Sequence, residues 1–576
     1  MNNGATPGPA PGAAAVPSGP LRPFAEIVKD AKVLPGYFNV WQKDEKVWLE
    51  IDPDQLNEPF FMTVNLSRGL GERMLFAGLM GGEYGVGGYY LAEMRRVGNT
   101  LQLIARNTQF TATPGSPEER AVRNAFSDSL LSAAPVVSLP HPERKSILVD
   151  ANALLLADIP RGSHVIERAY RNVYAFDRAN SYFADVKSNE DRTTLDVTAH
   201  FTQARIPLAP PQGGPFFAPP DVIEDPRSLF LGFLYTFTKL PDEPMRPRLA
   251  DARIGHFVMS KVDFSNERKA SPRTYYVERW RLEKKDPKAA MSEPIKPITF
   301  WLDREIPVKY RAPITAGILE WNKAFERIGF KNAIEVKQQP DDADFDTGDA
   351  LHASIRWMTT ATPSFGAIGP SHVDPRTGEI LDADIGWDAN MTRNLRIFRA
   401  EVANNNGGGN AIGYTPMYDE RTGELRAGKS QAATNGRACA HFEYAERELG
   451  FALAMLEARG ELDPESPQAE RFVAEYLKDV TMHEVGHALG LRHNFRASTV
   501  YTAEQLDDPD FTAKNGISGS VMEYSPINLG LRKGKQGQYF SSTLGPYDYW
   551  AIEYAYKPIA PEREAEELAT IAARAD

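Results

Sequence analysis

The sequence predicts an α+β multidomain protein in which a β-rich N-terminal region is followed by an α/β domain. Three observations predict this fold class. The chain has 576 residues, which is too long for one ordinary hydrophobic core. Short alternating apolar and polar runs dominate residues 21–283, whereas a strand–helix–strand order begins at residue 298. The charged, proline-containing segment 284–297 lies between the two patterns and is the expected linker.

The composition excludes some classes of partner. Hydrophobic residues make up 42% of the chain and charged residues 25%, as in a soluble globular protein. A net charge of −12 argues against nucleic-acid binding, which requires a basic face. The strongest apolar run, at 229–237, is about half as long as a membrane-spanning helix, so we expect no transmembrane segment. Cys439 is the only cysteine, so an intrachain disulfide is impossible.

The first 20 residues are an expected disordered leader, because Pro, Gly and Ala dominate them. They have neither the basic start nor the hydrophobic segment of an intact signal peptide. An exported chain whose signal has been removed fits this composition, and so does a cytosolic chain with a flexible tail.

The β-rich region, residues 21–283, is expected to comprise one or two domains. "FNVWQKDEKVWLEI" at 38–51 and "LAEMRRVGNTLQLIA" at 91–105 each predict a hairpin, because alternating runs flank a turn. Residues 117–133 predict a helix, with Ala121, Phe126 and Leu130 roughly on one face. Further strands are expected at 193–202, 229–237 and 274–283.

The region 298–576 is expected to form one α/β domain. "ITFWLD" at its start predicts a strand, and the next apolar periodicity predicts a helix that begins at Pro313 and ends at Gly329. Another helix is expected to start after Ser466-Pro467. The strands predicted between the two helices are 333–338, 353–359 and 378–388.

The second of these helices, which ends near Gly490, carries a candidate metal site. His483 and His487 are four residues apart, so they share one face and can hold one Zn²⁺. Glu484 can reach a water on that metal. Gly490 can end the helix in a conformation that other residues resist, so the chain turns back and brings His493 to the metal. Three histidines leave a fourth position for water, as a catalytic zinc site needs.

The alternative to a metal site is a helix with three surface or core histidines. The short pattern HExxH does occur by chance. The extended pattern HExxHxxGxxH arises by chance in roughly one chain of this length in 10⁴ to 10⁵. This rarity favours the metal site.

The zinc pattern and its surroundings resemble the metzincin family of zinc endopeptidases. Metzincins carry a tight turn with a methionine below the zinc, and "SVMEYSP" at 520–526 supplies Met522. Residues 544–557 are similar to the C-terminal helix of that fold, and residues 298–388 to its upper part. More narrowly, the chain looks like a group of large bacterial zinc-dependent metalloproteases with N-terminal domains of unknown function. Asn494, after the third histidine, matches no subfamily, so the resemblance implies no cleavage specificity.

The resemblance implies a metzincin-like α/β zinc catalytic domain over 298–576, with one catalytic Zn²⁺ held by the three histidines. Glu484 would accept a proton as the zinc-bound water attacks a peptide carbonyl. The phenol of Tyr524 would ligate the resting zinc or hydrogen-bond the tetrahedral intermediate; the alternative is a tyrosine that packs the pocket wall. Protein or peptide substrates and a secreted or periplasmic location are also implied.

Peptide substrates of metzincins pair antiparallel with an edge strand above the zinc. "GEILDADIGWD" at 378–388 is the candidate for that edge. Ala383, Asp384 and Ile385 are therefore candidate substrate-binding residues. The alternative is an internal strand of the sheet.

A calcium ion is the weaker cofactor prediction. Asp342, Asp344 and Asp346 are spaced as in a calcium loop. Thr347 stands where an EF-hand needs glycine, and no glutamate closes the loop, which favours a solvated acidic turn. The other histidines are scattered in the sequence and are assigned to no metal: His141, His164, His200, His256, His352, His372 and His441.

The sequence thus predicts a zinc-dependent endopeptidase. Two other functions stay open. One is a zinc hydrolase of another class, such as an amidase, and the other is a binding protein whose metal site is vestigial. The intact Glu484 argues against the second, because an inactive homologue would often lose this residue first.

Overall fold

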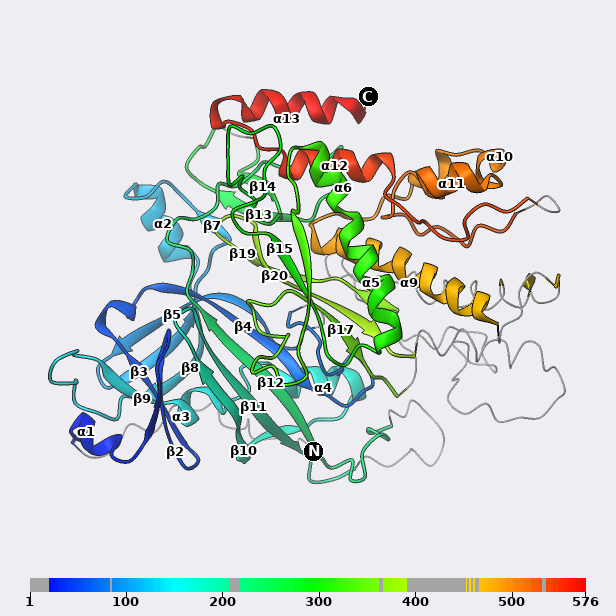
Figure 1. Ribbon diagram of the computed structural model, residues 1–576. Helices are drawn as coiled ribbons and strands as arrows, with labels where there is room; N and C mark the ends of the chain where they lie inside the picture. The colour runs from blue at the N-terminus through cyan, green and yellow to red at the C-terminus, as the bar shows by residue number, and fades with distance from the viewer. Residues whose placement is uncertain are drawn as a thin grey trace, which may run out of the picture. The chain divides into compact units, whose positions relative to one another are not determined.

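The computed structural model describes residues 20–82, 85–206, 218–268, 270–361, 366–390, 466–530 and 535–575, with Ala452, Met455, Leu456, Arg459 and Gly460. The expected leader lies outside the described residues except for Pro20, and Cys439 and His441 lie outside them too. Figure 1 gives the element labels used below. Within the described residues, no helix has both the length and the apolar character needed to cross a membrane.

The chain divides into two compact units, and the division differs from the expected boundary at 284–297. That segment is an ordered part of unit 2: Lys285 N donates to Glu293 O at 2.9 Å, and Lys331 N donates to Ser292 O at 2.9 Å. Charge and proline content suggested a linker, but these backbone hydrogen bonds hold the segment in place. Unit 1 comprises Met1–Gly69, Gly85–Glu243 and Val262–Pro272, and unit 2 comprises Leu70–Tyr84, Pro244–Lys261 and Arg273–Asp576.

Unit 1 is β-rich, as predicted, and is built on two antiparallel sheets. The larger sheet has seven strands in the order β10 (Ala175–Ser188), β11 (Arg192–Thr202), β12 (Ser228–Thr238), β4 (Pro59–Arg68), β5 (Gly88–Val97), β6 (Thr100–Ala105), β8 (Ser129–Pro135). The smaller sheet has the order β1 (Lys32–Leu34), β2 (Asn39–Lys43), β3 (Lys46–Ile51), β9 (Ile147–Asp150). In the core of unit 1, the rings of Phe38, Phe60 and Phe237 meet edge to face, with centroids 5.6–5.8 Å apart.

The two predicted hairpins of unit 1 are confirmed as β2–β3 and β5–β6. The helix predicted at 117–133 is too long, because α2 ends at Ala125. Phe126 leaves the helix and stacks on Phe110 at 3.7 Å, and Leu130 belongs to strand β8, where it pairs with Ile104. The other short elements are α1 (Phe24–Ile27), η1 (Pro53–Gln55), β7 (Phe110–Thr111), α3 (Ala151–Leu155) and α4 (Gly162–Tyr170).

Unit 2 contains a six-stranded mixed sheet that follows β13 (Val258–Asp263) and β14 (Arg273–Val277) in the chain. Its order is β16 (Ile334–Gln338), β15 (Ile298–Leu302), β17 (Ser354–Met358), β20 (Glu379–Asp388), β18 (Ala367–Ile368), with β19 (Ser371–Asp374) also paired to β20. The first four strands are parallel, whereas β18 and β19 run antiparallel to β20.

Helix α5 (Val308–Glu320) runs beside α9 (Pro467–Ala488), as Figure 1 shows. Trp321, which separates α5 from α6 (Asn322–Arg327), donates from Nε1 to Met482 O of α9 at 2.9 Å. The predicted start of this helix at Pro313 is wrong: the helix already begins after Pro307, and Pro313 lies inside it.

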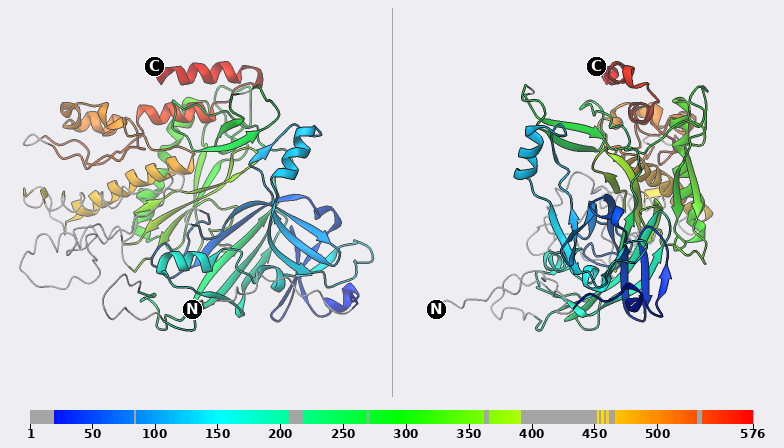
Figure 2. Two further views of the ribbon diagram at one scale, coloured as in Figure 1. Left: turned by 180° about the vertical axis from the view of Figure 1, so that it is seen from behind. Right: turned by 90° about the vertical axis from the view of Figure 1, so that its left-hand side faces the viewer.

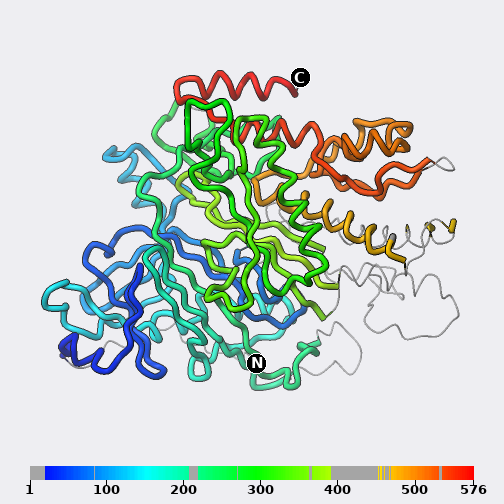
Figure 3. The backbone as a smooth tube through the Cα atoms, in the orientation of Figure 1, coloured from blue at the N-terminus to red at the C-terminus, as the bar shows by residue number. Residues whose placement is uncertain are grey.

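The chain after α9 forms short helices around the predicted methionine turn. The tube in Figure 3 traces it through η2 (Ala497–Thr499), α10 (Ala503–Leu506) and α11 (Pro509–Asn515). Helices α12 (Pro546–Tyr556) and α13 (Glu564–Ala572), red in Figure 2, lie side by side, and Trp550 Nε1 donates to Ile571 O at 2.7 Å. The remaining turns are η3 (Pro561–Arg563) and η4 (Ala573–Ala575).

Candidate metal centre

Helix α9 presents the two histidines of the motif on one face. Ser466 caps its N-terminus by accepting from Ala469 N, and Pro467 occupies the first turn. The imidazole centroids of His483 and His487 lie 4.8 Å apart. The four-residue spacing therefore places both imidazoles on one face of α9, as the sequence predicted.

Gly490 ends the helix with a positive φ of 95°. A Cβ atom at this position would also collide with Glu278 O. Leu491 N donates back to Gly486 O at 2.9 Å, which tightens the reversal. A residue with a side chain would strain this turn, and the turn is what returns the chain toward the helix.

The reversal brings His493 back to the other two histidines. Its Nε2 lies 3.0 Å from His487 Nε2, and one nitrogen of each of the three histidines lies within 4.8 Å of the others. His483 and His487 are buried, and His493 is half-buried. Within the described residues, this is the one converging group of three or more side chains of the types that ligate metals.

Backbone carbonyls fix the tautomers of the two helical histidines. His483 Nδ1 lies 2.6 Å from Val521 O, and His487 Nδ1 lies 2.8 Å from Leu491 O. Because a carbonyl oxygen only accepts, both Nδ1 atoms carry the proton, and both Nε2 lone pairs face the shared centre. Convergent imidazole nitrogens with carbonyl-bound Nδ1 groups fit Zn²⁺.

Glu484 lies beside this centre and is fully buried. Neither of its carboxylate oxygens has a hydrogen-bond partner among the described residues. Burial raises the pKa of its carboxyl to about 8. A Cβ atom on Gly369, just after β18, would lie 3.1 Å from Glu484 Oε2, so β18 ends close to this carboxylate.

The methionine turn lies against α9. Met522 is fully buried, and a Cβ atom at Gly486 of the helix would clash with its sulfur. Asp548 of α12 holds the turn: its carboxylate accepts from Ser520 Oγ at 2.5 Å and from Val521 N at 2.9 Å. The sequence analysis missed Asp548, because its partners are 27 and 28 residues away and no local pattern links them.

Tyr524 reaches the same centre. Its hydroxyl lies 3.4 Å from His493 Nδ1, and the two rings are 4.3 Å apart between centroids. Phe495 packs against both rings at 5.5 and 5.3 Å. The phenol is therefore positioned next to the third histidine, rather than remote from the metal site.

The predicted edge strand is internal. In β20, Asp384 and Ile385 pair with β17, and Ala383 pairs with β19, so partner strands flank β20 on both sides. All three are buried. Within the described residues, the strand at the end of the sheet order next to β20 is β18.

The acidic segment 341–350 does not gather Asp342, Asp344 and Asp346 into a converging group among the described residues. Asp346 accepts from Arg356 Nη1 at 3.1 Å and from Gly348 N at 2.8 Å. Two hydrogen-bond donors therefore contact its carboxylate.

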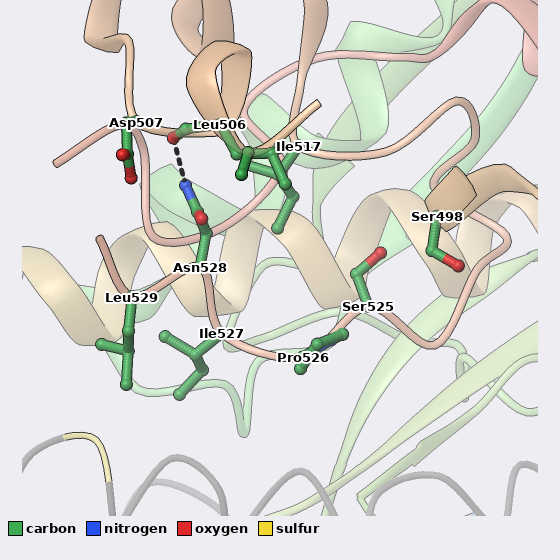
Figure 4. A pocket seen from close by; sticks show the side chains of 10 residues that line it. Ser498, Leu506, Asp507, Ile517, Ser525, Pro526, Ile527, Asn528 and Leu529 are labelled. Carbon is green, nitrogen blue, oxygen red and sulfur yellow. Dashed lines mark hydrogen bonds between the residues drawn. The ribbon is translucent and has the colours of Figure 1, made fainter. Parts of the chain in front are cut away.

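A cavity of about 260 Å³ is shown in Figure 4, and its lining includes Ser525, the residue that follows Tyr524 in the chain. It is bounded by the segment from Ser498 to Ile517 and by the segment from Ser525 to Leu529. Asn528 Nδ2 donates to Leu506 O at 2.8 Å and ties the two walls together. The lining is mainly apolar, with Asp507 as its single charged side chain.

Comparison with known families agrees with this geometry. Residues 465–576 match a family model described as Met-zincin. Residues 87–285 and 21–69 match two models described as domains of unknown function, DUF5117 and DUF5118. The sequence matches no curated protein and no solved structure. The C-terminal part of the chain is of the metzincin type, and together with the three histidines it supports a zinc metallopeptidase acting on protein substrates.

Proposed function

We propose that this protein is an endopeptidase that cleaves internal peptide bonds with Glu484 as its proton shuttle. The observation that carries the proposal is the convergence of three histidine nitrogens beside a buried carboxylate without hydrogen-bond partners among the described residues. When bound, zinc supplies a Lewis acid that polarises the peptide carbonyl and acidifies water. Glu484 takes the proton from the attacking water and passes it to the leaving amine.

Tyr524 would act on the same reaction. Its hydroxyl lies near His493, so a small rotation would direct the O–H group toward the oxygen of the reacting carbonyl. A donor placed there stabilises the negative charge that develops in the transition state.

Strand β18 replaces β20 as the proposed docking edge for the substrate backbone. Strand β18 is the last strand in the sheet order. Gly369, which directly follows β18, lies close to the carboxylate of Glu484. An extended peptide that pairs with β18 would bring its backbone past the metal centre. Affinity would then come mainly from backbone hydrogen bonds.

The cavity after Tyr524 is the proposed pocket for one substrate side chain. Its lining by Leu506, Ile517 and Ile527 favours an apolar side chain. Ile527→Trp should fill the pocket and shift the preference at one subsite toward small residues. An unchanged cleavage profile in this variant would show that the cavity does not bind a substrate side chain.

A peptide-library digest tests the proposal. The purified chain should cleave internal bonds of proteome-derived peptides, and both a chelator and Glu484→Ala should abolish cleavage. Release of acyl groups from non-peptide amides, without any peptide cleavage, would favour the amidase alternative. Absence of both activities in a zinc-loaded, folded preparation would favour the alternative of a binding protein whose metal site is vestigial.

The proposed location is secreted or periplasmic, and it rests on the resemblance to exported metalloproteases. Fractionation of the native cells, followed by immunodetection, tests it. Recovery in the cytosolic fraction alone would contradict the proposal.

A further inference from the structure

Three polar side chains on neighbouring strands of unit 1 form a continuous hydrogen-bonded chain. Asp177 lies on β10, His200 on β11 and Ser228 on β12. His200 Nδ1 lies 2.9 Å from Asp177 Oδ2, and His200 Nε2 lies 2.8 Å from Ser228 Oγ. The register explains the meeting: Asp177 pairs directly with His200, and Ser228 is the diagonal neighbour of His200.

The carboxylate determines the tautomer of His200. Hydrogen bonds from Asn180 and His200 lower the pKa of the Asp177 carboxyl, so it is ionised at neutral pH and can only accept. His200 Nδ1 must therefore carry the proton. Its Nε2 then has a lone pair and accepts the hydrogen of Ser228 Oγ–H. This is the arrangement by which a histidine acts as a general base toward a serine.

A β-bulge holds Asp177 in position. The register of β10 against β11 shifts between Asp177 and Tyr182. Within the bulge, Ala179 N donates to Asp177 Oδ1 at 3.1 Å and Asn180 Nδ2 donates to Asp177 Oδ2 at 2.6 Å. Bulges commonly redirect a side chain next to a functional site. Here the bulge supplies two donors that hold the carboxylate against the imidazole.

The serine is exposed, whereas the histidine is not. Ser228 is an exposed residue, and His200 retains 8% of its surface. Phe230, the direct cross-strand partner of His200, packs against the imidazole at a tilt, with ring centroids 4.7 Å apart, and is 50% exposed. The hydroxyl can therefore be reached from solvent, and an exposed aromatic surface lies beside it.

We propose that Ser228 is a nucleophile activated by His200 and Asp177, and that this site accepts activated carboxylic esters with an apolar acyl chain. Ser228 Oγ would bond to the ester carbonyl carbon while its proton passes to His200 Nε2. The ester C–O bond then breaks, and the leaving alcohol takes that proton. A water molecule would release the acid by the same steps in reverse order. Phe230 provides the apolar contact for the acyl chain.

The expected substrates are limited to esters with good leaving groups. Ser228 N already donates to Asp225 O at 3.0 Å, so the nucleophile's own amide is engaged and is not aimed at a developing oxyanion. The guanidinium of Arg227 is likewise paired with Asp225, at 2.7 Å. Base activation is then the main contribution to rate, and aryl esters are the class that needs least oxyanion stabilisation.

Labelling with an alkyl fluorophosphonate tests the proposal in the full chain carrying Glu484→Ala, which silences the zinc site. Peptide mapping should find the adduct on Ser228. Ser228→Ala should abolish the adduct, and His200→Gln should slow labelling by about 10²-fold, the lower end for loss of a general base. Hydrolysis of p-nitrophenyl butyrate should fall in parallel.

Ser67→Ala is the matched control. Ser67 Oγ donates directly to the carboxylate of Asp196 at 2.7 Å, rather than to a histidine. This variant should label at the parent rate. Asp177→Asn serves as a second variant if His200→Gln is unstable, and it should slow labelling as well. A folded parent chain without an adduct on Ser228, or equal labelling rates in the parent and both variants, would overturn the proposal.

Discussion

Histidines at the metal centre and in the sheet of unit 1 are held in the same tautomer by acceptors of different charge. His483 and His487 each donate from Nδ1 to a neutral backbone carbonyl, whereas His200 donates to the carboxylate of Asp177. A carbonyl orients the ring without favouring a second proton, which suits a metal ligand. A carboxylate stabilises the imidazolium, which suits a base. The same tautomer thus presents Nε2 to the shared metal centre at one site and to Ser228 Oγ at the other.

The largest expected effect is the loss of zinc in His487→Ala. Removal of one of three ligands should lower zinc affinity by at least ~10²-fold, since even loss of a supporting partner typically costs 10- to 100-fold. Elemental analysis of dialysed protein should show stoichiometric zinc in the parent and little in the variant.

His200→Ala is the control for that experiment and should retain the parent zinc content. Equal zinc content in the His487→Ala chain and the parent would refute the assignment of His487 as a ligand. Zinc loss in His200→Ala would instead undo the distinction between the two kinds of histidine.

Glu484→Ala is expected to lower peptide turnover by about 10² to 10⁴ while zinc content and folding stay unchanged, because it removes a proton shuttle and no ligand. Steady-state cleavage of a fluorogenic peptide measures the loss. Glu470→Ala is the matched control, since Glu470 lies on the same helix but at its exposed first turn. Substantial residual turnover in a clean Glu484→Ala preparation would leave Glu484 without the role proposed for it.

Tyr524→Phe should lower kcat by on the order of 10² to 10³ with little change in KM, if the phenol donates to the oxyanion. The ring and its packing on His493 are kept in this variant, so zinc content should not change. Tyr501→Phe, which removes a hydroxyl that donates to Asn515 O, is the control and should be silent in kinetics. Normal turnover of Tyr524→Phe would support the alternative in which the ring only packs the pocket wall.

The metal centre could be predicted because its information is local. His483, Glu484, His487 and Gly490 lie within two turns of one helix and its cap, so spacing alone fixes their relation. The chemistry of unit 1 could not be predicted in this way. His200 contacts residues 23 and 28 positions away, and only the pairing of three strands brings them together.

The edge strand was predicted wrongly for a related reason. The resemblance to metzincins gave the edge role to the strand 378–388, which carries Asp382 and Asp384. In the structure both aspartates are buried. Ser354 of β17 donates to Asp384 at 2.5 Å, and His372 of β19 contacts the segment 70–82 through Gly81 O at 2.8 Å. A contact with a segment that is remote in the sequence cannot be inferred from the residues of the strand itself.

Asp384→Asn gives the smallest expected effect and extends the comparison to carboxylates. Hydrogen bonds keep the pKa of Asp177 low, whereas burial raises the pKa of Asp384 to about 7. A group whose folded pKa exceeds its unfolded value binds protons more strongly when folded. Its contribution to stability is present at low pH and is lost as pH rises through about 7.

The parent should therefore lose about 2 kcal/mol more stability than Asp384→Asn between pH 5 and pH 8. Denaturant unfolding at both pH values measures this difference, with the exposed Asp342→Asn as the control. Parallel pH dependence in the parent and Asp384→Asn would mean that Asp384 stays ionised in its buried position.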